Sequence, residues 1–327
     1  MAATSTTEQW DAAWTTTMRT AKKDIVDNIF DAYPTLEYFQ DNMVTEEGGK
    51  EIQINLMYGK NAAQAFDSYD TLNTDAVDGV TAGFVPWRYY AVPITISQTE
   101  EWENRLPATR MTLLETKTKQ AMLTLRDTVN AAIYSAQSGK NMLGFQDWMA
   151  DVPSLGTLAG ISRVNESWWR NGVSTTATTF LTQTTTNVFD GFTRWQAVQD
   201  DIEEGNELVD AIFTTKSIVK AYRAALSSQG YARTELNNKK SMGVNVGRNP
   251  PWYGSDVQMD RDCASLHTYF LMGKYLKLHV MEGVNFAKTP FKHTSNQLAK
   301  VAFIVIGLQL VSDNVRRLGV ATAITGT

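Results

Sequence analysis

Cys263 and His267 come closest to a metal site in this sequence. They stand four residues apart, a spacing that would bring both side chains to one face of a helix. A structural zinc site needs four ligands, and no Cys-x-x-Cys pair or second nearby histidine completes this one, since His279 and His293 fall on separate elements. We therefore expect structural roles for these residues and no cofactor. Because Cys263 is the single cysteine, the chain has no internal disulfide.

Carboxylates and glycines form two further patterns that could do chemistry. Asp256, Asp260 and Asp262 could suggest calcium, but the glycine and the terminal glutamate of a calcium loop are missing, so we expect solvated carboxylates in turns. The glycine-bearing stretch 243–248 lacks the lysine of a phosphate-binding loop. No nucleophile with a neighbouring base stands out, so we do not expect an enzyme. The alternative is an enzyme with its site in the second half, which would need a pocket of convergent titratable groups.

Composition places the chain among folded proteins of one large domain or two. It has 327 residues, of which 43% are hydrophobic and 20% charged, enough to bury a core. The net charge of −5 argues against a dedicated nucleic-acid binder and leaves room only for local basic patches. Residues 1–7 do not look like a signal peptide, and the longest apolar run, Val301–Val311, is too short to span a bilayer. We expect no membrane partner.

The clearest pattern is a long helix over residues 107–137. This stretch has no glycine and no proline after Pro107, which suits a first helical turn. Such a helix would be about 46 Å long at 1.5 Å per residue, so other elements should pack along it. Gly139 suits its end. The residues expected to face the core, at spacings of three, four and seven, are Met111, Leu114, Ala121, Leu125, Val129, Ala132 and Ala136.

Two strands before this helix predict a long hairpin. Lys50–Tyr58 alternates apolar and polar residues, and we expect it to pair with Gly83–Thr99, where Pro93 predicts an edge strand. The 59–82 loop between them is unusually long, and a two-stranded hairpin is marginally stable alone. We therefore expect the hairpin to rest on another subunit, with Tyr89–Ile96 lying mainly against that subunit. The candidate contacts are Tyr58, Lys60, Phe66, Tyr69, Tyr89, Tyr90, Val92 and Ile94.

A helix is also predicted near Trp14–Ala32, with one apolar side that ends at Tyr33-Pro34. Two interpretations are equally compatible with the pattern. The helix packs on its own core, or it is an arm that lies on a neighbouring subunit. In the second case Trp14, Ile25 and Ile29 are candidate contacts.

The second half alternates helices and strands, as in an α/β subdomain. We expect helices near 187–204 and 216–229, and a buried strand at 208–215 between them. Thr268–Met272 and Tyr275–Met281 are predicted as strands joined by a Gly-Lys turn. Lys300–Val311 is the strongest strand of the chain.

Three sets of local strings, together with this order of elements, resemble the major capsid protein family of tailed bacteriophages. ITISQTEEWEN at 94–104 joins the hairpin to the long helix. VPSLGTLAGISR at 152–163 leads to WWRN at 168–171. The apolar strand 301–310, followed by NVRRLG at 314–319, closes the chain. No single string is specific, and the resemblance rests on their agreement over nearly the whole chain.

The resemblance implies an α+β shell subunit with four parts. They are an N-terminal arm (1–47), an extended-loop hairpin (48–98), a peripheral domain with the spine helix (99–150 and 264–296), and a mixed α/β axial domain (151–263 and 297–327). It also implies self-assembly into hexamers and pentamers of an icosahedral head that encloses double-stranded DNA. The subunit would be made in the host cytoplasm and end in the virion. The alternative is an encapsulin-like nanocompartment shell of the same fold that packages enzymes.

The resemblance also implies partners and residue roles. Since the hairpin begins near Lys50, we expect a separate scaffolding protein, together with a portal and a decoration protein. Some members cross-link subunits through a lysine of the extended loop. Lys60 is the only lysine between Lys50 and Lys117, although an ordinary surface role is expected for it. Arg316 and Arg317 could contact DNA or pair with nearby carboxylates. Maturation would rotate domains, with bending at the spine helix or at the joint 100–106.

Overall fold

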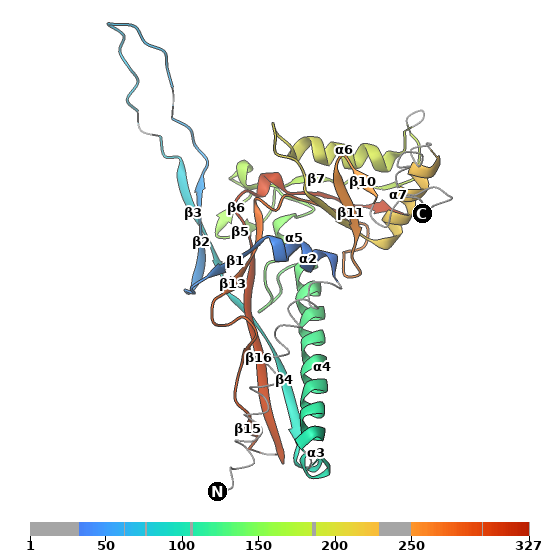
Figure 1. The fold of residues 1–327 in the computed structure, drawn as a ribbon. Coiled ribbons are helices and arrows are strands. Elements are labelled where there is room, and N and C mark those ends of the chain that lie inside the picture. Colours follow the sequence, from blue (N-terminus) through green and yellow to red (C-terminus); the bar gives the residue numbers. More distant parts are fainter. Residues whose placement is uncertain are drawn as a thin grey trace, which may run out of the picture.

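The computed structural model describes residues 33–61, 63–75, 77–104, 107–184, 188–228, 250–295 and 297–326. The helix predicted at 14–32, with Trp14, Ile25 and Ile29, lies outside these residues. The described part consists of two six-stranded sheets, the helices that cover them, a hairpin that projects from the body, and two smaller strand pairs (Figure 1). No described helix is both long enough and apolar enough to cross a membrane.

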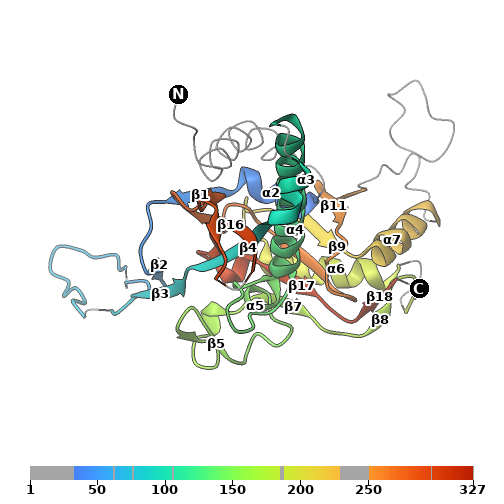
Figure 2. The same cartoon turned by 90° about the horizontal axis from the view of Figure 1, so that it is seen from below.

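The first sheet runs beside the long helix α4 (Pro107–Tyr134) (Figures 1 and 2). Its strands follow the order β1 (Met43–Glu46), β13 (Leu276–Met281), β16 (Ala299–Ser312) and β14 (Ala287–Lys288). Two more strands, β4 (Arg88–Ser97) and β15 (Lys292–His293), also pair with β16. The predicted apolar stripe of α4 is buried at Leu114, Ala121, Leu125, Val129 and Ala132.

The long helix is confirmed, but it ends at Tyr134 and Ala136 is exposed. The cause lies in the turn that follows. The Asp147 carboxylate accepts hydrogen bonds from the backbone N–H groups of Gln137 (2.7 Å) and Gly144 (3.0 Å), which draws the chain away from the helix axis. Gly144 approaches so closely that a Cβ there would lie 2.0 Å from the Ser135 carbonyl oxygen. The short helix α5 (Phe145–Trp148) then packs its Phe145 ring 5.1 Å from that of Tyr134.

The second sheet belongs to the predicted α/β region. Its strand order is β10 (Pro251–Trp252), β11 (Ser255–Met259), β9 (Ala211–Thr214), β12 (Thr268–Leu271), β17 (Gly319–Ala321) and β7 (Gly172–Ser174). One face packs on helices α6 (Asp190–Ile202) and α7 (Lys216–Ser228), around Trp195 and Tyr222. The other face contributes Phe213 and Tyr269 to the core of the first sheet. The two sheets therefore share one continuous apolar interior.

The hairpin differs from its prediction in one strand. Strand β2 (Glu51–Met57) has the expected alternation, but its partner is β3 (Val80–Pro86), and the predicted second strand divides at Trp87. Beyond that buried residue the chain enters the first sheet as β4 and pairs with β16, from Arg88↔Leu308 to Ser97↔Ala299. The long apolar strand β16 provides a partner more than 200 residues away, which sequence periodicity could not indicate. Strand β4 pairs with β16 alone, so Pro93 lies on an edge as predicted.

A second correction concerns β12 and β13, which do not form the predicted hairpin. Each joins a different sheet, because Tyr269 and Leu271 complete the core between the sheets while β13 pairs with β1 and β16. The expected domain ranges placed 264–296 in the peripheral part and 297–327 in the axial part. The sheets divide these segments differently, since β12 lies in the second sheet and β16 in the first.

Short elements complete the chain. The helices are α2 (Pro34–Asp41) and α3 (Gln98–Glu103), with 3-10 turns at Ser167–Trp169 and Val315–Arg317. The strands β5 (Thr157–Leu158) and β6 (Ile161–Ser162) form a small hairpin, and β18 (Ile324–Thr325) pairs with β8 (Thr178–Thr179).

Candidate assembly surfaces

The base of the β2–β3 hairpin rests on its own chain. Ile52, Ile54, Leu56 and Val85 are buried, and the Phe84 N–H donates a 3.0 Å hydrogen bond to the Ala159 carbonyl between β5 and β6. Beyond these residues the Tyr58 and Trp168 rings stack, with centroids 5.1 Å apart and planes 8° apart. The chain therefore holds the hairpin itself at this end. Tyr58, predicted as an inter-subunit contact, has its ring engaged within its own subunit.

The other end of the hairpin has no such support. Every described residue between positions 61 and 78 is exposed, and Figure 1 shows this loop extending away from the body. Phe66 is 69% exposed and Tyr69 is fully exposed. Lys60 is exposed as well. Large apolar side chains on a bare loop favour contact with another protein, so Phe66 and Tyr69 remain candidates for inter-subunit contact.

Strand β4 is only partly available for the predicted contact with other subunits, because one of its faces is buried in its own subunit. Ile94 is only 2% exposed and packs in the subunit's own core, so it is not available to a neighbour. Val92 is partly buried against the same core. The Tyr90 hydroxyl accepts a 3.0 Å hydrogen bond from the Met142 N–H, and burial raises the pKa of this phenol. Only Tyr89 keeps a largely exposed ring among the four β4 residues predicted to contact a neighbour.

The joint between β4 and α4 is held by two ion pairs. Ser97 and Glu100 form a reciprocal N-terminal cap of α3, and the Glu100 carboxylate also lies 2.7 Å from Lys117 Nζ. The hydrogen bond from Lys117 lowers the pKa of Glu100, and the bond from the Ser97 N–H adds to this effect. The second pair joins Glu101 to Lys300 of β16 at 3.0 Å, with 4% and 5% of the respective side chains exposed. This buried ion pair stabilises the joint, because loss of either partner would remove the opposite charge beside a buried ionic group.

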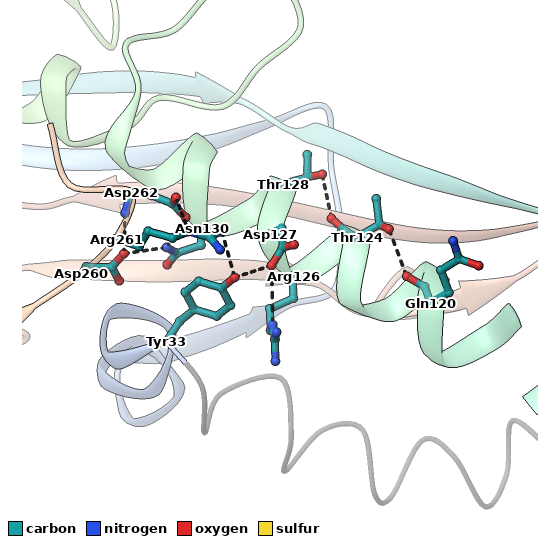
Figure 3. A network of polar contacts seen from close by, with 10 residues as sticks. All are labelled: Tyr33, Gln120, Thr124, Arg126, Asp127, Thr128, Asn130, Asp260, Arg261 and Asp262. Carbon is teal, nitrogen blue, oxygen red and sulfur yellow. Dashed lines mark hydrogen bonds and ion pairs between the residues drawn. The ribbon is translucent and has the colours of Figure 1, made fainter. Parts of the chain in front are cut away.

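A polar network ties the start of the described chain to α4 and to the second sheet (Figure 3). Asn130 of α4 donates to Asp260 Oδ1 (2.9 Å) and to Asp262 Oδ2 (2.8 Å), while Thr35 donates to Asp260 Oδ2 (2.8 Å). Figure 3 also shows Tyr33 hydrogen-bonded to Asp127 and Arg261. Asp260 is therefore a buried acceptor and not the solvated turn carboxylate that we expected. The sequence did not indicate this burial, because the partners of Asp260 lie far from it in the chain.

The candidate metal ligands do not form a centre. Cys263 is buried, and burial raises the pKa of its thiol, which disfavours the thiolate that metals bind. His267 lies with Nε2 3.1 Å from the Asp151 carboxylate and Nδ1 2.6 Å from the Ser265 carbonyl oxygen. Among the described residues no cluster of three or more histidine, cysteine or acidic side chains could hold a metal ion.

Arg316 and Arg317, the two candidates for contact with DNA, have different surroundings. Arg317 is paired with Glu204 and Glu207 just after α6, and it also donates to the Ile202 carbonyl oxygen at 3.0 Å. Of the two roles considered for these arginines, contact with DNA or pairing with nearby carboxylates, Arg317 has the second. The Arg316 side chain is exposed, and it forms no ion pair with a described residue. Of the two, Arg316 is the one available to a polyanion.

An apolar groove opens between α2, α4, β13 and β16. Its lining residues include members of all four elements, and Arg126 is the one charged residue among them. The apolar residues lining it include Leu36, Leu125, Val129, Leu278, Ile306 and Leu308.

Comparison with known proteins gives a consistent result for the fold. No protein-family model matches the sequence, and no curated protein sequence matches it either. Solved structures do match. A subunit of the cyanophage A-1(L) capsid aligns over 90% of this chain and 94% of its own, at 16% identity and a TM-score of 0.66. The capsid subunit of a native GTA particle aligns over 86% of this chain and 88% of its own, at 9% identity and a TM-score of 0.57.

An encapsulin also shares this architecture. The SrpI encapsulin of Synechococcus elongatus covers 87% of this chain and 85% of its own, at 7% identity and a TM-score of 0.54. All three similarities cover more than four-fifths of this chain. The fold class expected from the sequence is thereby confirmed: the chain has the α+β major-capsid-protein fold of tailed bacteriophages, which an encapsulin shell shares.

Proposed function

We propose that this chain is a major capsid protein that self-assembles into a closed shell around double-stranded DNA. The observation that carries the proposal is the agreement with the cyanophage capsid subunit over nine-tenths of both chains. The bare loop between 61 and 78 supports it, because such a loop is stable only when a neighbour covers it. Many modest contacts per subunit suffice in a closed shell, since each is strengthened by the others.

More specifically, we propose that the shell is an icosahedral head built from hexamers and pentamers of this chain. The subunit assembles in the host cytoplasm with a separate scaffolding protein, a portal and a decoration protein. Head maturation is a rigid-body rotation of domains, with bending either at the long helix α4 or at the joint 100–106. No enzymatic activity is proposed. Uniform shells formed by the chain expressed alone would contradict the need for a scaffolding protein.

Electron microscopy of the purified protein tests the main proposal. We expect regular closed particles in negative stain when the chain is expressed with a scaffolding protein from the same source, and irregular or incomplete assemblies when it is expressed alone. A small soluble oligomer under all of these conditions would contradict the proposal.

Contact with packaged DNA is proposed for Arg316, and it should be non-specific and weaken with salt. Replacing Arg316 with glutamine should loosen DNA retention, while the matched Arg317→Gln change should act mainly on the fold.

The apolar groove between α2, α4, β13 and β16 favours a second candidate function, an encapsulin-like shell. A groove lined by Leu36, Leu125, Val129 and Leu278 has the character needed to bind an apolar segment of a cargo protein. The contents of purified particles distinguish the two candidates. Nuclease-protected DNA supports the phage head, whereas a co-purifying enzyme without DNA supports the nanocompartment.

A further inference from the structure

We propose that residues 14–32 dock in the apolar groove of their own subunit, between α2, α4, β13 and β16. The docked segment completes the subunit core and keeps any second polypeptide out of the groove. This inference goes beyond the proposed function, because it concerns the folded subunit before any assembly. It also decides between the two interpretations of the helix predicted at Trp14–Ala32, which were packing on its own core and an arm on a neighbour.

The groove lies between two helices that cover different parts of the first sheet. Helix α4 packs along β4, whereas α2 packs on β13. Met43 also lines the groove and is 38% exposed, and the neighbouring lining residue Phe286 is only partly buried. An apolar space flanked by helices suits the apolar face of a further helix. The strand residues that line it are Leu278, Val280, Ile306 and Leu308.

Residues 14–32 have the matching character. Their apolar side chains recur at spacings of three and four residues, and the opposite side of the predicted helix carries Thr16, Thr20, Lys23 and Asp27. One side therefore fits an apolar groove while the other fits water. A single amphipathic helix gains most of its stability from packing of its apolar face. The residues of that face are Met18, Ala21, Ile25 and Ile29, with Val26 and Phe30 beside them.

Tyr33 holds the end of this segment at the groove. Its hydroxyl donates a hydrogen bond to Asp127 of α4 and accepts one from Arg261 at 3.2 Å (Figure 3). The guanidinium of Arg126 lies 4.7 Å from the centre of the Tyr33 ring. Arg126 lines the groove, and so does Leu36, three residues after Tyr33. The segment therefore joins the described chain at the margin of the groove.

This attachment favours the segment's own groove over that of another copy. A tethered segment meets the groove at an effective concentration on the order of millimolar. A segment from a second copy, or from a cargo protein, would first have to displace it. Docking within the subunit therefore acts against the second candidate function, in which the same groove binds cargo.

A photo-cross-linker at Phe30 tests where the segment docks and in which copy. Benzoylphenylalanine in place of Phe30 keeps an aromatic side chain beside the apolar face, about one helical turn before Tyr33. The full-length chain is cross-linked both as the unassembled subunit and in particles made from a mixture of nitrogen-15-labelled and unlabelled copies.

We expect mass spectrometry to find cross-links from position 30 to peptides containing residues 36–43, 125–129 or 278–286. Each cross-link should join two peptides with the same label. Cross-links between labelled and unlabelled peptides would overturn docking within one subunit. Cross-links to other surfaces alone, or no cross-links at all, would overturn the choice of groove.

Charge placed on either side of the segment provides a second test. Ile25→Asp with Ile29→Asp puts two carboxylates on the apolar side, whereas Thr16→Asp with Thr20→Asp adds the same charge on the opposite side and is the matched control. In the unassembled subunit, amide hydrogen exchange of residues 278–286 should become at least about tenfold faster in the first variant. It should stay unchanged in the control. Equal exchange in the two variants would contradict the docking.

These results are separable from the proposed shell function. Docking in a chain that never forms particles would contradict only the proposed shell. Particles in which position 30 cross-links outside the groove would contradict only the docking.

Discussion

Strand β4 and the loop tip (residues 63–75) had the same predicted role, yet the structure gives them different environments. Both carry large apolar side chains before the long helix, and both were expected to lie against another subunit. In the structure β4 pairs along its whole length with β16 and buries Ile94 and Ile96, whereas residues 63–75 are exposed throughout. An apolar pattern shows that a surface will be covered but not whether the same chain covers it. A fitting strand elsewhere in the chain decides that question.

The largest expected effect concerns the buried pair that fixes the end of β4. Replacing Lys300 with methionine leaves Glu101 charged in a nearly closed environment, and this should lower the free energy of unfolding by about 3–5 kcal/mol. Urea unfolding of the unassembled subunit measures the change. The matched double variant, Lys300→Met with Glu101→Met, should regain much of the loss because both buried charges are then removed. Equal stability of the single variant and the original chain would show that this joint does not hold β4.

The core face of β4 should show the next largest effect. Ile94→Ala removes a buried side chain beneath α4, and we expect it to destabilise the subunit by about 3 kcal/mol. Thermal unfolding of the unassembled subunit measures this loss. Pro93→Ala changes the neighbouring exposed position of the same strand and is the control, with an expected change below about 1 kcal/mol. A small effect of Ile94→Ala with failed assembly would return β4 to its predicted role at a subunit interface.

The N-terminal cap of α3 should make stability depend on pH. The Lys117 hydrogen bond lowers the pKa of Glu100 below its ordinary value of 4.5, so its stabilisation is fully present above that value. It is lost as the pH falls through the lower pKa of the folded state. Because this ion pair is partly exposed, the contribution is at most about 1 kcal/mol.

Urea unfolding at a series of pH values tests this contribution. Glu100→Gln should be less stable than the original chain at neutral pH, and the difference should shrink below pH 4.5. Glu103→Gln, on the same helix and exposed, is the control and should not change with pH in this way. A constant difference for Glu100→Gln at all pH values would exclude ionisation as its cause.

The smallest effect on folding is expected at the loop tip. Phe66→Ala with Tyr69→Ala should change the free energy of unfolding by less than about 0.5 kcal/mol, because these side chains lack support from their own subunit. Particle yield in sucrose gradients should nevertheless fall strongly. A variant that unfolds more easily, or that assembles normally, would remove the distinction between the loop tip and β4.

Sequence periodicity predicted the elements whose burial depends on local spacing. The stripe from Leu114 to Ala132 and the alternation of Ile52, Ile54 and Leu56 both matched the structure. Their core faces follow from helix and strand geometry alone. The edge position of β4 followed from Pro93 in the same way.

The errors have one physical cause, which is that distant partners leave no local trace. Nothing near Arg88 specifies pairing with Leu308, and nothing near Asp260 indicates that Asn130 and Thr35 will surround its carboxylate. Lys300 interrupts a strongly apolar strand, and that anomaly could have predicted a buried ionic partner. For the loop tip, the unusual length and composition were informative because no distant part of the described chain covers it.

The continuous path from β3 through Trp87 into β4 has a mechanical consequence. A neighbour that holds the loop tip pulls the hairpin, and the load passes along the backbone into β4. The hydrogen bonds between β4 and β16 lie perpendicular to that pull, so the ladder from Arg88 to Ser97 is strained in shear and its bonds resist together. The outward pressure of a filled container would thus be borne by the longest strand pairing in the subunit, and not by a single contact at its rim.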